Sequence, residues 1–233
     1  MTMFPYFGLD PTMILLLPAL LLAGYAQWKV SSAFNKFSKV ATAGGRTGAA
    51  IAAEILRRRG IPEVKIEQVD GMLSDHYDPR SKTLRLSPAV YASNSVSAVG
   101  VAAHECGHAL QDKERYAPLA LRSAIVPVAN IGTSAAWILF FIGMLTQRGI
   151  LMDLGILLFL GYVVFALVTL PVEFDASRRA VAVLQGEGLV MSLEADGVKT
   201  VLNAAALTYV AAAAMAILQL ARLLLIRNMR DND

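Results

Sequence analysis

Long apolar stretches constrain this chain more than any other feature of its sequence. Residues 12–28, 125–145, 151–170 and 201–226 consist mainly of apolar side chains, and each approaches or exceeds the roughly 20 residues that a helix needs to cross a bilayer. A lipid-embedded segment must satisfy its own backbone hydrogen bonds, which favours helices. The apolar fraction of 56% over 233 residues agrees with this reading. We therefore predict an integral membrane protein with about four transmembrane helices.

The distribution of charge indicates how the chain is oriented. No basic residue precedes the first apolar stretch, whereas Lys29, Lys36, Lys39 and Arg46 follow it. This order is the opposite of that in a cleaved signal peptide, so we expect a retained anchor. By the positive-inside rule, the segment after the anchor is cytoplasmic. The net charge of +3 is modest and gives no reason to expect nucleic acid as a partner.

A histidine pair lies in the segment 102–110, which contains the motif His-Glu-Cys-Gly-His. His104 and His108 are four residues apart, so on a helix they lie about 40° apart around the axis and one turn along it. Both imidazoles could therefore bind one metal ion. Glu105 lies beside them, where it could polarise a metal-bound water. Because two of only three histidines fall in this pattern, we favour a metal site over two histidines that are merely packed in a core.

Cys106 is the only cysteine, so no intrachain disulfide can form. A thiolate could serve as a fourth zinc ligand, but the next-but-one position on a helix points about 200° away from His104. We therefore expect Cys106 to be a small buried core residue.

A third metal ligand must come from elsewhere, because a catalytic zinc usually takes three protein ligands and one water. The short link 146–149 predicts a tight transmembrane hairpin, which returns the chain to the side of the histidine pair. His76, Glu173 and Asp175 are then the candidates. Glu173 follows a span directly, at the start of a helix that we expect to open at Pro171. The helix dipole alone also favours an acidic residue at a helix start. Position therefore does not decide whether Glu173 is a metal ligand or only an acidic residue favoured there.

The segment between the first two spans contains signals for a small globular part. Residues 46–59 have the pattern of an amphipathic helix that ends before Gly60. The arginines at 57–59 lie in its last turn, where they are either solvated or in contact with anionic lipid headgroups. Alternating segments at 64–69 and 83–86, each next to a turn signal, predict a small antiparallel sheet. Ser87-Pro88 starts a further helix, and Asn94 or Ser95 caps the helix of the histidine pair.

The histidine motif, two apolar helices and then Glu173-Phe174-Asp175-Ala176-Ser177 resemble the neutral zinc metallopeptidase 2 family of bacterial membrane proteins. The resemblance runs nearly end to end and includes residues 74–80 and 171–177. The chain is more distantly similar to the prenyl-protein endopeptidases and the heat-shock membrane metalloproteases, whose E-x-x-A-D motif supplies a glutamate ligand. Glu173 and Ala176 match that motif. Ser177 replaces its aspartate, which supports a zinc-binding histidine, so we expect that support to be built differently, with Asp175 as one candidate.

The resemblance implies an α+β membrane protein with a mostly helical, zincin-like (gluzincin) core. It implies Zn²⁺ bound by His104, His108 and Glu173, with Glu105 as the general base of an endopeptidase that acts on protein or peptide substrates. For oxyanion stabilisation we consider His76 first, then Tyr77, Arg178 and Arg179. Strand 83–86 could bind an extended substrate at its edge. The alternative function is a non-catalytic membrane zinc-binding scaffold or sensor.

These inferences divide the chain into five segments of a multi-pass protein of the cell (inner, cytoplasmic) membrane. They are an N-terminal transmembrane anchor (1–29), a cytoplasmic catalytic segment (30–123), a transmembrane hairpin (124–170), a cytoplasmic segment with the third ligand (171–200), and a C-terminal transmembrane helix with its tail (201–233). Arg222, Arg227 and Arg230 conflict with an outside carboxyl terminus. The side of that terminus and the oligomeric state stay open.

Overall fold

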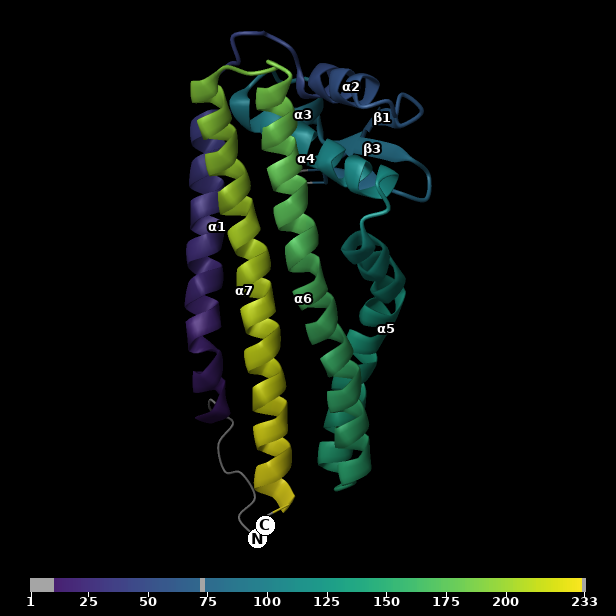
Figure 1. Ribbon diagram of the computed structural model, residues 1–233. Coiled ribbons are helices and arrows are strands. Elements are labelled where there is room, and N and C mark those ends of the chain that lie inside the picture. Colours follow the sequence, from purple (N-terminus) through teal and green to yellow (C-terminus); the bar gives the residue numbers. More distant parts are fainter. Residues whose placement is uncertain (1–10, 72–73, 232–233) are drawn as a thin grey trace. The chain divides into compact units, whose positions relative to one another are not determined.

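The computed structural model describes residues 11–71 and 74–231, which form two compact units (Figure 1). Unit 1 contains the described residues up to Tyr25 together with 121–168 and 209–231, and unit 2 contains 26–120 and 169–208. Residues 1–10 of the predicted anchor, Met72 and Leu73, and residues 232–233 of the predicted tail lie outside the described residues.

Helices make up most of the described chain, as the sequence predicted. They are the 3₁₀ helix η1 (Pro11–Leu16) and the α-helices α1 (Leu17–Phe37), α2 (Gly48–Arg58), α3 (Pro88–Tyr91), α4 (Val96–Lys113), α5 (Ala117–Leu145), α6 (Gly149–Gly186) and α7 (Ser192–Asp231). The strands are β1 (Lys65–Gln68), β2 (His76–Asp78) and β3 (Thr83–Leu86).

Three of the described helical segments are long and apolar enough to cross a membrane, namely 11–37, α6 and α7. A fourth candidate is α5, whose two parts, Ala117–Pro127 and Ala129–Leu145, meet at 45°. The bend coincides with Pro127, which cannot donate a backbone hydrogen bond and whose ring displaces the preceding turn. The expectation of about four spans therefore corresponds to three unbroken helices and one bent helix.

Unit 1 contains the apolar hairpin formed by α5 and the first half of α6. The hairpin is tight because two glycines lie where its helices meet. A Cβ on Gly155 would come within 2.7 Å of the Ala136 carbonyl oxygen, and one on Gly143 within 2.7 Å of the Met152 backbone nitrogen. An ion pair joins α7 to this hairpin, with Arg227 Nε 2.8 Å from Asp153 Oδ1.

The sheet in unit 2 is mixed, which corrects the prediction of an antiparallel sheet. Its strand order is β1-β3-β2. β2 and β3 form the expected antiparallel pair, but β1 runs parallel to β3, with Lys65 opposite Thr83. Alternating side chains identify a strand and its buried face but do not encode the direction of its partner. The central strand β3 is the most buried, with Leu84 and Leu86 fully covered.

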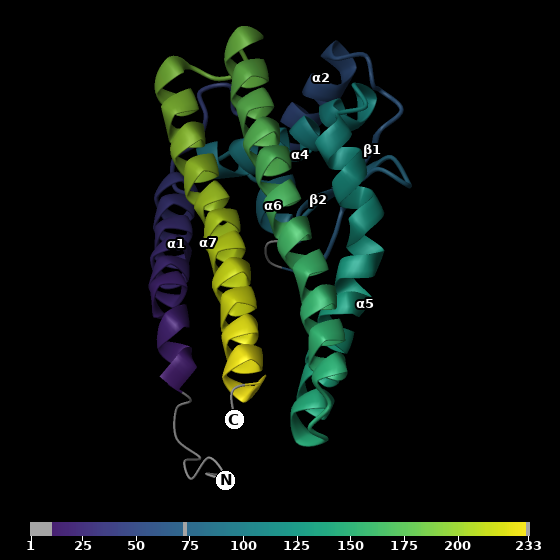
Figure 2. The same ribbon diagram turned by 60° about the horizontal axis from the view of Figure 1, so that its bottom comes forward.

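The core of unit 2 is formed by side chains of α2, α4 and the sheet together with parts of α6 and α7. Figure 2 shows α2 and α4 beside the strands. Helix α2 presents Ile51, Ile55 and Leu56 to this core, and its arginines lie at its end. Thr47 caps its amino terminus, and Gly60 follows its end with a φ of +66°. The core holds α4 in place along most of its length.

Helix α6 differs from the expectation that a new helix begins at Pro171. It is continuous from Gly149 to Gly186, with Pro171 inside it. A proline removes one helical hydrogen bond and need not end a helix whose other bonds are made. As a result, Glu173 lies in the interior of a long helix and not at a helix start.

Candidate metal centre

Helix α4 carries the histidine pair and is well fixed at its start. Ser95 is its cap, since its hydroxyl accepts a hydrogen bond from the backbone amide of Ala98. The His104 and His108 rings meet edge to face, with centroids 4.8 Å apart. Their side chains are only 14% and 10% exposed. The two imidazoles therefore form a nearly buried pair on one side of α4, as their spacing predicted.

Gly107 allows α6 to approach this side of α4 very closely. A Cβ at Gly107 would come within 2.4 Å of the carbonyl oxygen of Ala176 and 3.0 Å of its Cα. Only a glycine fits such an approach without movement of the backbone. The contact brings the turn of α6 that contains Glu173 and Ser177 against the histidines.

The Glu173 carboxylate faces both imidazoles. Its Oε2 lies 3.2 Å from His104 Nε2 and 3.6 Å from His108 Nε2, and one ligand atom from each of the three residues lies within 4.8 Å of the others. Ligands about 2.0 Å from a tetrahedral zinc are separated by about 3.3 Å. Two imidazole nitrogens and one carboxylate oxygen at these separations are a donor set that fits zinc.

The remaining ring nitrogens also have partners. His104 Nδ1 lies 3.1 Å from Ser177 Oγ, and His108 Nδ1 lies 3.0 Å from Gln111 Oε1. When Nε2 binds a metal, Nδ1 carries the proton and its N–H donates a hydrogen bond to these oxygens. The hydrogen bond fixes the tautomer and the orientation of each ring. The histidine support is therefore built by a hydroxyl and an amide. Ser177, which stands at the position where the similar E-x-x-A-D motif has an aspartate, contacts His104 through its hydroxyl.

Gln111 was missed by the sequence reasoning, although it links His108 to Asp175. It is fully buried, and its Nε2 donates to the Val172 carbonyl over 2.8 Å and to Asp175 Oδ2 over 3.0 Å. These two bonds orient the amide so that its oxygen faces His108. The available signal was its position three residues after His108, which places both residues on one side of α4.

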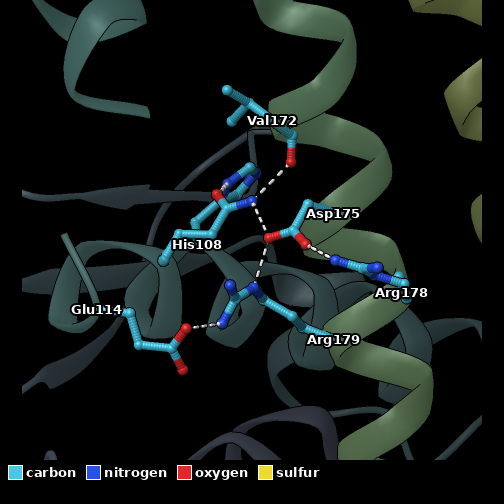
Figure 3. Close-up of polar contacts among 7 residues, drawn as sticks. His108, Glu114, Val172, Asp175, Arg178 and Arg179 are labelled. Carbon is cyan, nitrogen blue, oxygen red and sulfur yellow. Dashed lines mark hydrogen bonds and ion pairs between the residues drawn. The ribbon is translucent and has the colours of Figure 1, made fainter. Parts of the chain in front are cut away.

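Asp175 supports the centre indirectly, because it contacts Gln111 and not an imidazole. Arg178 and Arg179 both form ion pairs with it (Figure 3). Arg179 also pairs with Glu114 at the end of α4, where its Nη1 lies 2.5 Å from Glu114 Oε2. A chain of hydrogen bonds and ion pairs thus joins α4 and α6 beside the histidines.

Glu105 is buried next to the histidine pair, with 7% of its surface exposed. Burial by itself would lower the pKa of His108, but hydrogen bonding to the Glu173 carboxylate and the charge of Glu105 outweigh it, so that the pKa is raised. Cys106 faces the core, where its Sγ lies 3.8 Å from the Ala52 carbonyl oxygen and burial raises the pKa of its thiol. The expectation of a buried core cysteine is confirmed.

The candidates for oxyanion stabilisation do not join the ligand cluster. His76 is exposed on β2, where its Nδ1 lies 2.7 Å from the Ser74 carbonyl oxygen and its Nε2 3.5 Å from Arg85. The Tyr77 hydroxyl donates instead to Asp112, over 2.7 Å. Arg178 and Arg179 are engaged in the ion pairs described above. His76 remains a prediction that needs an experiment.

Comparisons with known proteins agree with this site. A family model described as "Putative neutral zinc metallopeptidase" matches residues 12–228. The chain is also similar to "Putative membrane protease YugP" of Bacillus subtilis (strain 168), with 48% identity over 220 residues that cover 94% of this chain and 98% of the relative. No solved structure matches the chain.

Proposed function

The chain belongs to the neutral zinc metallopeptidase family, and from this membership we propose that it is a membrane-embedded, zinc-dependent endopeptidase. The observation that carries the proposal is the convergence of His104, His108 and Glu173 within 4.8 Å, with Glu105 buried beside them. Two imidazoles, a carboxylate ligand and a neighbouring glutamate are the groups that hydrolysis of a peptide bond by an activated water requires.

His104, His108 and Glu173 are the proposed zinc ligands. When bound, zinc would lower the pKa of a bound water toward about 7 and polarise the substrate carbonyl. Ser177 and Gln111 would keep the two imidazoles in the orientation that presents Nε2. The role of these five side chains is to hold the ligand geometry fixed.

Glu105 is the proposed general base. Its carboxylate would accept a proton from the attacking water and then donate it to the nitrogen of the leaving amine. His76 is proposed to stabilise the developing oxyanion, a role for which its place on β2, packed against α4, is the support. Loss of one such donor typically lowers kcat by about 10²- to 10³-fold, so His76→Ala should show a reduced kcat with an unchanged zinc content.

The deciding experiment compares Glu105→Gln with the wild-type protein in detergent. Digestion of an unstructured test protein and zinc content are measured with and without a chelator. We expect Glu105→Gln to retain zinc and lose hydrolysis, whereas Glu63→Gln, an exposed glutamate outside the site, should behave as wild type. Loss of zinc from Glu105→Gln would contradict the assigned role. A wild-type protein that binds zinc but cleaves nothing would support the alternative of a scaffold or sensor.

We also propose that segments 30–123 and 171–200 face the cytoplasm, with the anchor 1–29, the hairpin 124–170 and the helix 201–226 in the membrane. The basic residues that follow the first apolar stretch support this orientation. The presence of His104 and Glu173 in one unit agrees with it, because both must lie on the same side of the bilayer.

A further inference from the structure

A groove of about 390 Å³ runs between α6 and α7 within unit 2. Its α6 side extends from Phe174 to Gln185, and its α7 side from Lys199 to Asn203. The α6 residues that line it recur at intervals of three and four, so they form one continuous face of that helix. The groove therefore follows one face of α6, and its volume is enough to hold a large side chain.

The groove begins at the candidate metal centre. Ser177 lines it, and the same hydroxyl lies 3.1 Å from His104 Nδ1. Phe174, which also lines it, directly follows the proposed ligand Glu173. Glu173 and Ser177 are one helical turn apart, which is about 5.4 Å. The groove therefore lies beside the candidate metal centre, on the Nδ1 side of His104.

The lining combines apolar side chains with positively charged ones. Phe174, Val181 and Leu202 supply the apolar part, and Arg178 and Lys199 supply the charge. No carboxylate is among the described residues that line the groove. The carboxylates that pair with the two cations, Asp175 and Asp196, lie one turn earlier on the same helices. The side chains of Arg178 and Lys199 are 79% and 45% exposed and can reach a further anion.

We propose that this groove is a substrate subsite that takes an apolar side chain with an acidic side chain next to it. The proposal rests on the proposed endopeptidase function and names the substrate feature that the same site selects. The apolar wall would bind the large side chain, and Lys199 and Arg178 would attract the neighbouring carboxylate. The amides of Gln185 and Asn203, which also line the groove, suit a polypeptide backbone.

The first experiment maps cleavage sites. Zinc-loaded full-length protein in detergent digests an unstructured test protein, and mass spectrometry identifies the cuts. We expect apolar-acidic pairs to be enriched at one fixed distance from the cut. Lys199→Glu should lower the ratio of acidic to basic residues at that distance by about three- to tenfold. This size is expected when the attraction between a partly exposed lysine and a substrate carboxylate becomes a repulsion. Lys65→Glu, an exposed cation on β1, is the charge-matched control and should leave the pattern unchanged.

A second variant tests the apolar part of the groove. Ala182 is exposed and lines the groove, so Ala182→Trp would fill it without disturbing the core. We expect cuts next to large apolar residues to fall by about tenfold relative to cuts next to alanine or serine. Leu193→Trp, at an 85% exposed position of α7 outside the groove, is the matched control. Zinc content and thermal unfolding establish that each variant is folded.

A binding measurement separates this proposal from the proposed function. A fluorescent, N-acetylated and C-amidated peptide with repeated Leu-Glu pairs is titrated into zinc-loaded Glu105→Gln, with and without Lys199→Glu. Weaker binding of the double variant supports the groove even if the wild-type protein cleaves nothing, a result that would count only against the peptidase function. Unchanged cleavage sites and unchanged peptide affinity would overturn the proposal. If Lys199→Glu leaves the cleavage sites unchanged but reduces the binding of phosphatidylglycerol vesicles, the groove would be assigned to lipid instead.

Discussion

Gln111 donates from Nε2 to Asp175 Oδ2 over 3.0 Å, while its Oε1 lies 3.0 Å from His108 Nδ1. A neutral amide therefore stands between the histidine and the carboxylate, and it joins α4 to α6 beside the proposed zinc ligands. Asp175 thus acts on His108 through Gln111, and its own contacts are with that amide and with Arg178 and Arg179.

Gln111→Ala should weaken zinc binding by about 10- to 100-fold, because His108 loses the acceptor that fixes its tautomer. The affinity is measured by competition with a chelator of known strength. Gln68→Ala, at an exposed position of β1, serves as the control. An unchanged zinc affinity in a folded Gln111→Ala protein would show that the amide does not support the ligand.

Ser177 should respond to substitution in both directions. Ser177→Ala removes the acceptor for His104 Nδ1 and should lower zinc affinity, whereas Ser177→Asp supplies a carboxylate, a stronger acceptor, and should raise it. The same chelator competition measures both variants. Equal affinities for the alanine and aspartate variants would contradict a hydrogen bond to His104.

Gly107→Ala should destabilise the protein by about 1–3 kcal/mol, as expected when a methyl group is forced into a packed contact. The added Cβ would push the Ala176 backbone away and move Glu173 from the histidines, so zinc content should fall as well. Denaturant unfolding in detergent and metal analysis test this. Gly186→Ala is the control, because a Cβ there meets nothing within 4 Å.

Zinc binding should weaken as the pH falls. The raised pKa of His108 in the metal-free protein means that protons compete with zinc more strongly at this proposed ligand than at an ordinary histidine. In that protein, protonated His108 stabilises the fold below the unfolded pKa of about 6.5, and this contribution is lost as the pH rises through the folded pKa. After a chelator has removed zinc, the protein should therefore melt at a higher temperature at pH 6 than at pH 8. The difference between the two melting temperatures should be smaller in His108→Gln than in the wild-type protein.

The orientation can be tested with single cysteines, because Cys106 is the only native one and is buried. In a Cys106→Ala background, we expect Thr146→Cys in the hairpin link to react with an impermeant thiol reagent added to intact cells. Gln68→Cys on β1 should react only after the cells are opened. The reverse pattern would place the proposed site outside the cytoplasm.

The sequence was sufficient to predict that His104 and His108 lie together on one side of α4, because helical periodicity places them so regardless of their surroundings. Glu173 needed family resemblance, since nothing in its local sequence distinguishes a ligand from an acidic residue favoured by a helix dipole. The structure adds Gly107, whose contact with Ala176 explains how α6 reaches the histidines. That contact joins residues far apart in the chain, which no local pattern encodes.

Two parts of the fold could not be predicted for related reasons. The parallel pairing of β1 with β3 depends on how the chain returns between them, and the alternation of side chains is the same in both directions. Pro171 is a frequent helix boundary, but within α6 the hydrogen bonds of the surrounding turns keep the helix continuous. In both cases tertiary context decides between two locally acceptable structures.

The separation of His104 and Glu173 by 69 positions has a consequence for biosynthesis. The histidine pair leaves the ribosome before the hairpin of α5 and α6 has been made, and until then Glu173, the proposed third ligand, does not exist. A nascent chain can therefore hold at most the two histidines of the proposed centre. Under the proposed function, acquisition of the complete centre would report that the hairpin has been made, and an unfinished chain could not cleave its neighbours.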